Sequence, residues 1–186
     1  MSAGQRTLVG SSIPPLRLTF FMWLVFVIEG AFFLNLGVFG IYPRTMFGLI
    51  GIVTAPVLHG DLLHLVSNTI PLMFLGVVLF FYYNKIATAV FLRCYFVTNI
   101  LVWIFARPSL HIGASGLVYG LASFLIFYGF FKRDLRSLII SVIVTMLYGG
   151  IFYGVLPSNP MVSWESHLFG AAVGLWTAVS LRKKKA

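Results

Sequence analysis

The chain has 186 residues, of which 60% are hydrophobic and only 9% are charged. Soluble domains carry roughly 25% charged residues, so 13 basic and 4 acidic side chains could not cover the surface of a soluble protein of this length. This composition excludes an ordinary soluble enzyme, a disordered chain and a nucleic-acid-binding module. The single cysteine, Cys94, excludes a disulfide framework and a cysteine-based metal cluster.

Six apolar stretches are each close to the roughly 20 residues that a helix needs to cross the hydrocarbon core of a membrane. They cover residues 18–39, 62–83, 86–106, 112–131, 136–155 and 163–181. No stretch alternates as the strands of a membrane β-barrel do. The sequence therefore predicts an all-α polytopic membrane protein: an N-terminal tail over 1–17, a six-helix membrane domain over 18–181 and a basic tail over 182–186.

The segment 40–61, between the first two spans, is too apolar for a solvated loop and too interrupted by Gly and Pro for a span. Irregular backbone is tolerated at membrane depth only where it packs on protein or lines water. We therefore expect this first outer loop to be a structured element in the membrane interface.

The distribution of basic residues predicts the orientation. If the N-terminus is cytoplasmic, the outer side carries only Arg44 and Arg107, and Arg93 lies within the third span. The inner side then carries Arg6, Arg17, Lys85, Lys132, Arg133, Arg136, Arg182, Lys183, Lys184 and Lys185. Because cytoplasmic loops are rich in Lys and Arg, both termini are predicted to be cytoplasmic, in a bacterial inner membrane. Topology thus explains the net charge of +9 without a nucleic-acid partner, and the basic tail could also bind anionic lipid.

Polar residues gather near the predicted outer ends of three spans. His64 and Asn68 lie four residues apart in the second span, hence on one face of a helix. Ser115 lies near the start of the fourth span and His167 near the start of the sixth. Because polar residues inside membrane spans are costly, their shared depth predicts a common site.

Glycines indicate which spans touch. The fourth span has a GxxxG face at Gly116 and Gly120, and the sixth has one at Gly170 and Gly174. Such faces let two helix backbones approach closely in lipid. Close packing of these spans would bring a serine hydroxyl and an imidazole within reach of each other.

A hydroxyl becomes a strong nucleophile when a base removes its proton, and neutral imidazole suits that role near pH 7. Ser115 and His167 are therefore the candidate nucleophile and base. The amide of Asn68, a ring N–H of His64 and the backbone N–H groups around Ser115 could stabilise a developing oxyanion. No acidic residue is suitably placed as a third member, so a Ser–His dyad is predicted. Tyr119, one turn after the serine, would pack on the imidazole.

Three motifs in order resemble the rhomboid intramembrane serine proteases: HxxxxHLxxN over 59–68, GASG over 113–116, and a His followed by GxxxG over 167–174. The resemblance implies a rhomboid-like bundle with a water-filled cavity open to the outside and a capping loop over 155–163. It also implies that substrate approaches sideways between the second and fifth spans. One departure is Tyr-Pro-Arg at 42–44, where many members have Trp-Arg.

Carried over residue by residue, the resemblance makes Ser115 and His167 catalytic, and His64 and Asn68 the oxyanion donors. The supporting residues are Tyr119, His59, Gly113, Gly116, Gly170 and Gly174. The implied activity is endopeptidase cleavage in or near the transmembrane helix of single-span or other membrane proteins, with no cofactor and no metal.

Some residues have open interpretations. His59 either supports the site by hydrogen bonding or only sits at the interface, and His111 is expected to be interfacial. Glu29 either pairs with Arg93 or lines an inner polar pocket.

Three other functions remain as alternatives. A non-catalytic rhomboid-like protein would bind membrane clients without cutting them, but would normally lack the serine or the histidine. A metal enzyme could use His59, His64, His111 and His167, although no HExxH motif is present. A small transporter is expected to show internal repeats or paired broken helices, which the sequence lacks.

The predicted topology can be tested with cysteines introduced at positions 2 and 186. Because ten of the loop basic residues fall on one side and two on the other, both cysteines should react only when a reagent reaches the inner face. Labelling of either position by an impermeant reagent added outside intact cells would contradict this orientation.

Overall fold

The computed structural model describes residues 7–132, 134–157 and 162–182. Its helices are α1 (Leu8–Ala31), α2 (Gly51–Thr54), α3 (Leu62–Tyr82), α4 (Asn84–Phe105), α5 (Ser115–Lys132), α6 (Leu135–Tyr148) and α7 (Trp164–Leu181). Short 3-10 segments are η1 (Leu36–Phe39), η2 (Phe47–Leu49), η3 (Ala55–Val57) and η4 (Gly149–Val155). The predicted all-α bundle is confirmed. Of the residues used to predict orientation, Arg6, Arg133 and Lys183–Lys185 lie outside the described residues, as do 158–161 of the expected capping loop.

Four described helices, α1, α3, α4 and α5, are long and apolar enough to cross a membrane. The other two spans differ for local reasons. α6 has only 14 residues before the backbone tightens into η4, and α7 carries Glu165 and His167 close to its start.

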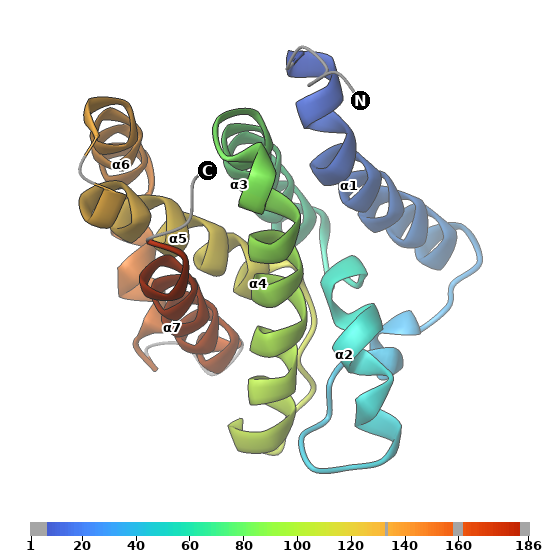
Figure 1. Cartoon of the computed structure of the whole chain (residues 1–186). Helices are drawn as coiled ribbons and strands as arrows, with labels where there is room; N and C mark the ends of the chain where they lie inside the picture. Colours follow the sequence, from blue (N-terminus) through green and yellow to red (C-terminus); the bar gives the residue numbers. More distant parts are fainter. Residues whose placement is uncertain (1–6, 133, 158–161, 183–186) are drawn as a thin grey trace.

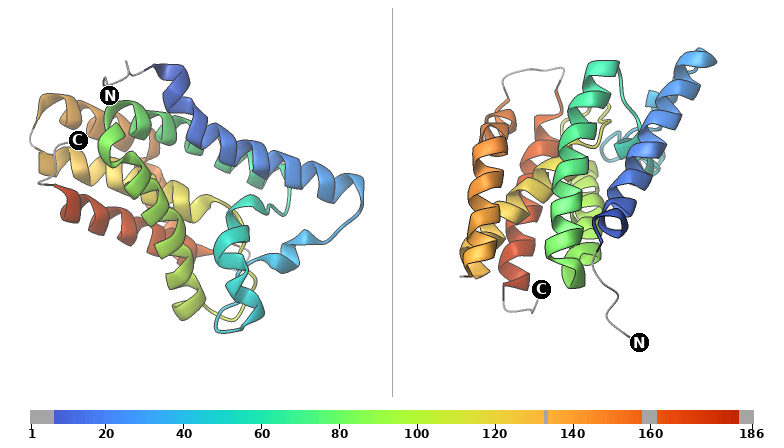
Figure 2. Two further views of the ribbon diagram at one scale, coloured as in Figure 1. Left: turned by 45° about the vertical axis from the view of Figure 1, so that its right-hand side comes forward. Right: turned by 90° about the horizontal axis from the view of Figure 1, so that it is seen from above.

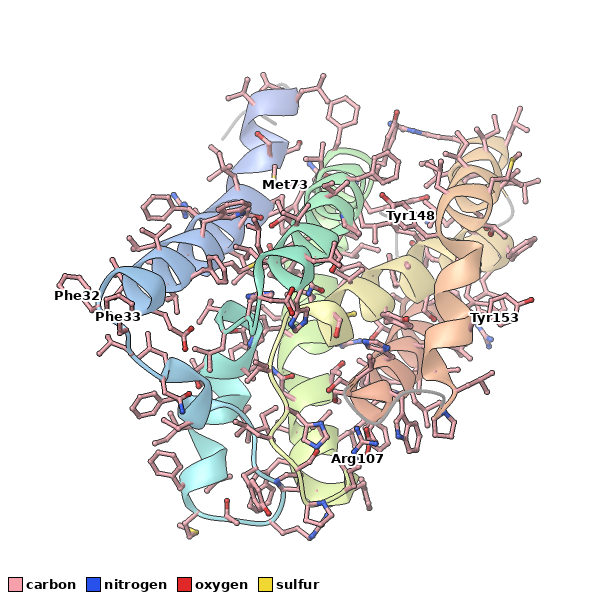
Figure 3. All side chains as sticks on the ribbon, turned by 180° about the vertical axis from the view of Figure 1, so that it is seen from behind. Phe32, Phe33, Met73, Arg107, Tyr148 and Tyr153 are labelled. Carbon is pink, nitrogen blue, oxygen red and sulfur yellow. The ribbon has the colours of Figure 1, made fainter. Side chains whose placement is uncertain are left out.

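The bounds of α1 differ from those of the predicted first span, 18–39, at both ends. α1 begins at Leu8, where the hydroxyl of Thr7 accepts a hydrogen bond from the backbone N–H of Gly10. The helix therefore includes residues assigned to the tail over 1–17. It also ends earlier, since it stops at Ala31 and Phe33 then takes a positive φ of 52°. Figure 3 shows Phe32 and Phe33 pointing away from the bundle at this end of α1.

Two prolines lie within the early part of α1. Pro14 and Pro15 lie inside the helix, although proline removes a backbone donor. Membrane helices tolerate proline where a neighbouring helix packs against it. Gly76 of α3 supplies that neighbour, because a Cβ placed there would come within 2.6 Å of the Pro15 ring.

The fifth predicted span, 136–155, is also corrected. The α-helix ends at Tyr148, and residues 149–155 form a 3-10 segment instead. Gly149, Gly150 and Gly154 lie in this segment, and glycine is unfavourable in an α-helix because its unfolded backbone is so free.

α5 is the central helix of the bundle, and every residue from Gly116 to Ile126 is buried. α1 lies at one edge of the bundle and α6 at the opposite edge, with α5 passing between them (Figures 1 and 2). Hydroxyls tie the neighbours to this helix: Ser123 donates to the carbonyl of Ala171 at 2.7 Å, and Ser141 donates to that of Ile126 at 2.6 Å.

The glycine faces predicted on α5 and α7 do meet. A Cβ added at Gly170 would lie 2.1 Å from the carbonyl oxygen of Gly116, and one added at Gly174 would lie 2.2 Å from that of Gly120. Only glycine at positions 170 and 174 permits this approach, so these two residues set the spacing between the helices, whereas a Cβ at Gly116 or Gly120 would lie closest to Thr98 or Cys94 of α4.

The first outer loop is structured, as expected, and it packs on α4. The Arg44 guanidinium donates to the carbonyls of Ile104 and Ala106, at 3.1 and 2.8 Å. The Trp103 indole N–H donates to the carbonyl of Thr45 at 2.9 Å. The loop thus lacks its own Trp but is held by one from α4.

Glu29 and Arg93 do not pair. The Glu29 carboxylate accepts the backbone N–H of Leu36 at 2.8 Å, which fastens the turn after α1. Arg93 instead donates to the hydroxyl of Ser180 at 2.9 Å and lies over the ring of Trp176.

The close contact of α5 and α7 predicts that Gly170→Ala destabilises the protein. The added methyl group would overlap the Gly116 carbonyl, and overpacking of this kind costs about 1–3 kcal/mol. Gly30→Ala is the matched control, because a Cβ at Gly30 of α1 meets nothing within 4 Å. Thermal unfolding in detergent should show a lower midpoint for Gly170→Ala alone, and equal midpoints would contradict the packing.

Candidate active site

The starts of α3, α5 and α7 meet at a cavity of about 970 Å³. The residues singled out from the sequence that line it are His64, Asn68, Ser115, Tyr119 and His167. They come from three helices, and the folded chain brings them to one place near three helix N-termini.

Ser115 and His167 are in hydrogen-bond contact. The Ser115 hydroxyl lies 2.9 Å from Nε2 of His167, and Nδ1 of the same ring lies 2.9 Å from the carbonyl oxygen of Gly154. A carbonyl can only accept, so Nδ1 carries the proton. Nε2 therefore presents its lone pair to the hydroxyl, which is the arrangement that a general base requires.

The Gly154 carbonyl occupies the place where a triad would have its third member. The sequence predicts no such member, because a backbone carbonyl has no side-chain signature. Gly154 was visible only as one of three glycines in this region. A Cβ at Gly154 would lie 1.9 Å from the Tyr119 hydroxyl oxygen and 3.2 Å from Nδ1 of His167, so a larger residue would push the carbonyl away.

Tyr119 packs on the imidazole as expected. Its ring is stacked on that of His167, with centroids 4.0 Å apart and planes 10° apart. The carbonyl and the tyrosine together hold the ring in one plane and one tautomer.

His64 and Asn68 converge on the backbone just before Ser115. A Cβ at Gly113 would lie 2.5 Å from Nε2 of His64 and 3.7 Å from the amide nitrogen of Asn68. Gly113 also has φ +102°, a conformation that L side chains rarely adopt. Glycine is required here twice, for the backbone angle and for the approach of the two side chains.

Local capping fixes these side chains. The Asp61 carboxylate accepts the backbone N–H of His64 at 2.8 Å and begins α3 there. The Asn68 amide donates to the His64 carbonyl at 2.9 Å, which leaves its second N–H available. α5 begins at Ser115, so its first backbone N–H groups have no partner within the helix and lie at the positive end of its dipole.

His59 does not support the site through a hydrogen bond to any described residue. Both of its ring nitrogens are buried without a partner in the described structure, and its ring meets that of His64 edge-on, with centroids 4.9 Å apart. Burial, and then the neighbouring His64, lower the pKa of His59 to about 4. The ring is therefore neutral at physiological pH and acts as a packing partner of His64.

His111 lies just before α5, and its side chain is buried within the protein. Its side chain is 1% exposed, with Nδ1 2.6 Å from the Ser163 hydroxyl and Nε2 3.1 Å from the Arg107 carbonyl. The Arg107 side chain in turn forms an ion pair with Glu165 at 3.4 Å. This second group of polar residues was not predicted, although His111 and Ser163 lie four residues before Ser115 and His167.

The four histidines do not gather as metal ligands would. His167 faces Ser115, His111 faces Ser163, and His59 contacts His64 through ring edges. Within the ranges that the structure covers, three or more His, Cys, Asp or Glu side chains are nowhere grouped so as to hold a metal ion.

Residues 46–184 match the Rhomboid domain. The chain belongs to the rhomboid family. With its apolar helices, this makes it an integral membrane protein. The matched region contains all of the rhomboid-like site residues described above.

Relatives in mycobacteria extend the similarity toward the N-terminus. An uncharacterized protein of Mycobacterium tuberculosis is 34% identical over 177 residues, which is 86% of this chain and 70% of that protein. An uncharacterized protein of Mycobacterium bovis has the same values. One of Mycobacterium leprae is 40% identical over 148 residues, 70% of this chain and 55% of that protein. Their names assign no activity.

Proposed function

We propose that this rhomboid-family membrane protein is a serine endopeptidase that cuts peptide bonds in or near the transmembrane helix of other membrane proteins. The observation that carries the proposal is the alignment of the Ser115 hydroxyl, the His167 ring and the Gly154 carbonyl beside a cavity. A serine that serves only helix packing has no need of an imidazole with its lone pair on the hydroxyl.

In the first step, the Ser115 oxygen attacks the scissile carbonyl carbon while Nε2 of His167 takes the hydroxyl proton. The ring becomes an imidazolium, whose Nδ1–H stays on the Gly154 carbonyl. Collapse of the tetrahedral intermediate breaks the C–N bond, and His167 gives its proton to the leaving amine. Water then attacks the acyl-enzyme by the same route and frees the serine.

The oxyanion would be stabilised by donors on the Gly113 side of the serine. These are the second N–H of the Asn68 amide, a ring N–H of His64 and the backbone N–H groups that begin α5. Removal of one such donor typically costs about 10²–10³ in rate.

We infer that the substrate is a membrane protein with a single helix, cut near the outer face. Ser115 and His167 lie near the N-terminal ends of α5 and α7, which the distribution of basic residues predicts to face the outside. The scissile bond must therefore come to the depth of these helix ends. A helical bond is shielded by its own hydrogen bonds, so about one turn must unwind. Glycine and proline near the cut lower that cost, by roughly 1 and 3 kcal/mol relative to alanine.

A gap between α3 and α6 lies toward the side of the bundle that the basic residues predict to be inner, so it does not by itself open a sideways path to the dyad. A cavity of about 590 Å³ lies between the two helices, lined by apolar side chains and Arg136. Ring contacts bridge its two ends: the Arg136 guanidinium lies 4.6 Å from the Tyr82 ring centroid, and the Phe74 and Tyr148 rings are 5.6 Å apart. Figure 3 shows Tyr148 between these helices.

The dyad is tested with Ser115→Ala and His167→Ala. Each should abolish cleavage of single-span reporter proteins, and the double variant should be little worse than either, because the two residues act as one unit. Ser67→Ala is the matched control, since Ser67 lines the same cavity but its hydroxyl donates only to its own helix, at the His64 carbonyl. Substantial cleavage by either single variant would refute the dyad. A wild-type protein that binds reporters without cutting them would favour a non-catalytic client-binding protein.

The oxyanion donors are tested with His64→Ala and Asn68→Ala. Both should lower the cleavage rate by about 10²–10³ through loss of one donor, while some labelling of Ser115 by a serine-reactive probe persists. Rates and folding are compared with those of Ser67→Ala. Wild-type rates in both variants would remove these residues from the oxyanion site.

A further inference from the structure

A second serine–histidine–carbonyl unit lies beside the first. The Ser163 hydroxyl is 2.6 Å from Nδ1 of His111, whose Nε2 is 3.1 Å from the carbonyl of Arg107. In the proposed dyad, the Ser115 hydroxyl and His167 Nε2 are 2.9 Å apart. The second unit also borders the cavity.

The direction of each hydrogen bond in the second unit can be derived. The Arg107 carbonyl can only accept, so Nε2 of His111 carries the proton and Nδ1 accepts from the Ser163 hydroxyl. Burial lowers the pKa of His111, which lies outside the membrane-spanning helices, so the ring is neutral at pH 7. The Ser163 oxygen, 2.7 Å from that of Ser166, then accepts the Ser166 hydroxyl.

Ser163 directly precedes α7, in the N-cap position, but its hydroxyl does not cap the helix. A serine at this position usually accepts a backbone N–H of its own first turn, which is worth about 1 kcal/mol. Here no such bond forms, and the hydroxyl reaches across to His111. The bond between segments takes the place of the local cap.

The second serine–histidine pair has the same spacing along the chain relative to the first pair at both of its residues. His111 precedes Ser115 by four residues, and Ser163 precedes His167 by four. The segment that leads into α5 and the segment that leads into α7 are therefore joined twice, with serine and histidine exchanged between them.

Further bonds make the His111 segment rigid. Ile41 and His111 exchange two backbone hydrogen bonds, each 2.9 Å, which fasten the segment to the first outer loop. Arg107 forms an ion pair with Glu165 and donates to the carbonyl of Val162 at 2.8 Å. Figure 3 shows Arg107 beside the start of α7.

We propose that His111 and Ser163 form a clamp that positions the start of α7 against the start of α5 and so sets the distance between Ser115 and His167. These are positioning residues, because they act on the reacting atoms only through the helix starts. This proposal rests on the proposed serine endopeptidase function.

Ser163 is poorly suited to be a second nucleophile. Its oxygen already accepts from Ser166, and His111 is almost completely buried, so substrate has little room to approach along the bond between them. The observations therefore favour a positioning role for Ser163. A nucleophilic role for Ser163 is one of the outcomes that the test below can reveal.

The experiment measures the second-order rate at which a fluorophosphonate probe labels purified protein in detergent, with the site of the adduct read by mass spectrometry. Ser163→Ala and His111→Leu should each slow labelling of Ser115 by about 10- to 100-fold, because a displacement near 1 Å costs up to about 10² in rate. The double variant should be no slower than His111→Leu, since His111→Leu already breaks the hydrogen bond between His111 and Ser163.

Conservative variants separate the clamp from a general loss of structure. Ser163→Thr keeps the hydroxyl, and His111→Gln keeps an acceptor for Ser163 and a donor for the Arg107 carbonyl, so both should recover most of the rate. Ser180→Ala is the matched control, because it removes a hydrogen bond between helices at the far end of α7 and should label at the wild-type rate.

Three results would overturn the clamp. One is full labelling of Ser115 in both Ser163→Ala and His111→Leu. Another is slow labelling that neither conservative variant rescues. The third is a probe adduct on Ser163 in the Ser115→Ala variant, which would make Ser163 a nucleophile.

Hydrogen exchange distinguishes failure of the clamp from failure of the proposed function. If the wild type neither labels nor cuts, the function fails while the clamp remains open to test. Amide exchange over residues 162–167 should be faster in Ser163→Ala than in Ser163→Thr, whatever the activity. Equal exchange in the two variants would overturn the clamp.

Discussion

The approach of the α5 and α7 backbones is the contact on which the rest of the site depends. Gly170 lies against the Gly116 carbonyl, and Gly174 lies against that of Gly120. In lipid there is little hydrophobic force between helices, so close van der Waals packing and hydrogen bonds such as Ser123 to Ala171 hold them together. This spacing lets a short serine side chain on one helix reach an imidazole on the other.

Backbone carbonyls orient two of the three buried histidines in the described chain, His167 and His111. The Gly154 carbonyl takes the Nδ1 proton of His167, and the Arg107 carbonyl takes the Nε2 proton of His111. A carboxylate in either place would also fix the tautomer, but burying an ionised carboxylate near the membrane is costly unless it is fully paired. A neutral carbonyl fixes the tautomer without that penalty.

Much of the candidate site could be predicted because its side chains carry a recognisable pattern. His64 and Asn68 follow helical spacing, and Ser115 and His167 each stand beside a glycine face, so shared depth and close packing suffice to group them. The contribution of Gly154 could not be predicted, since only its carbonyl acts. The pairing of His111 could not be predicted for a related reason: Ser163 is brought to it by long-range packing, and the Arg107 carbonyl, four residues away, has no side-chain signature.

By itself the sequence determined the all-α membrane class, the approximate place of the helices and the glycine faces, because hydropathy and residue spacing are local properties. It did not determine where α1 begins, since Pro15 within that helix packs against Gly76 of α3, a contact that only the folded bundle provides. Nor did it determine that η4 replaces the end of the fifth span. The tertiary structure decided the tautomer of His167, the burial of His111 and the pairing of Ser163. Each of these depends on which backbone carbonyl or hydroxyl a distant segment presents, and that is set only when the helices pack.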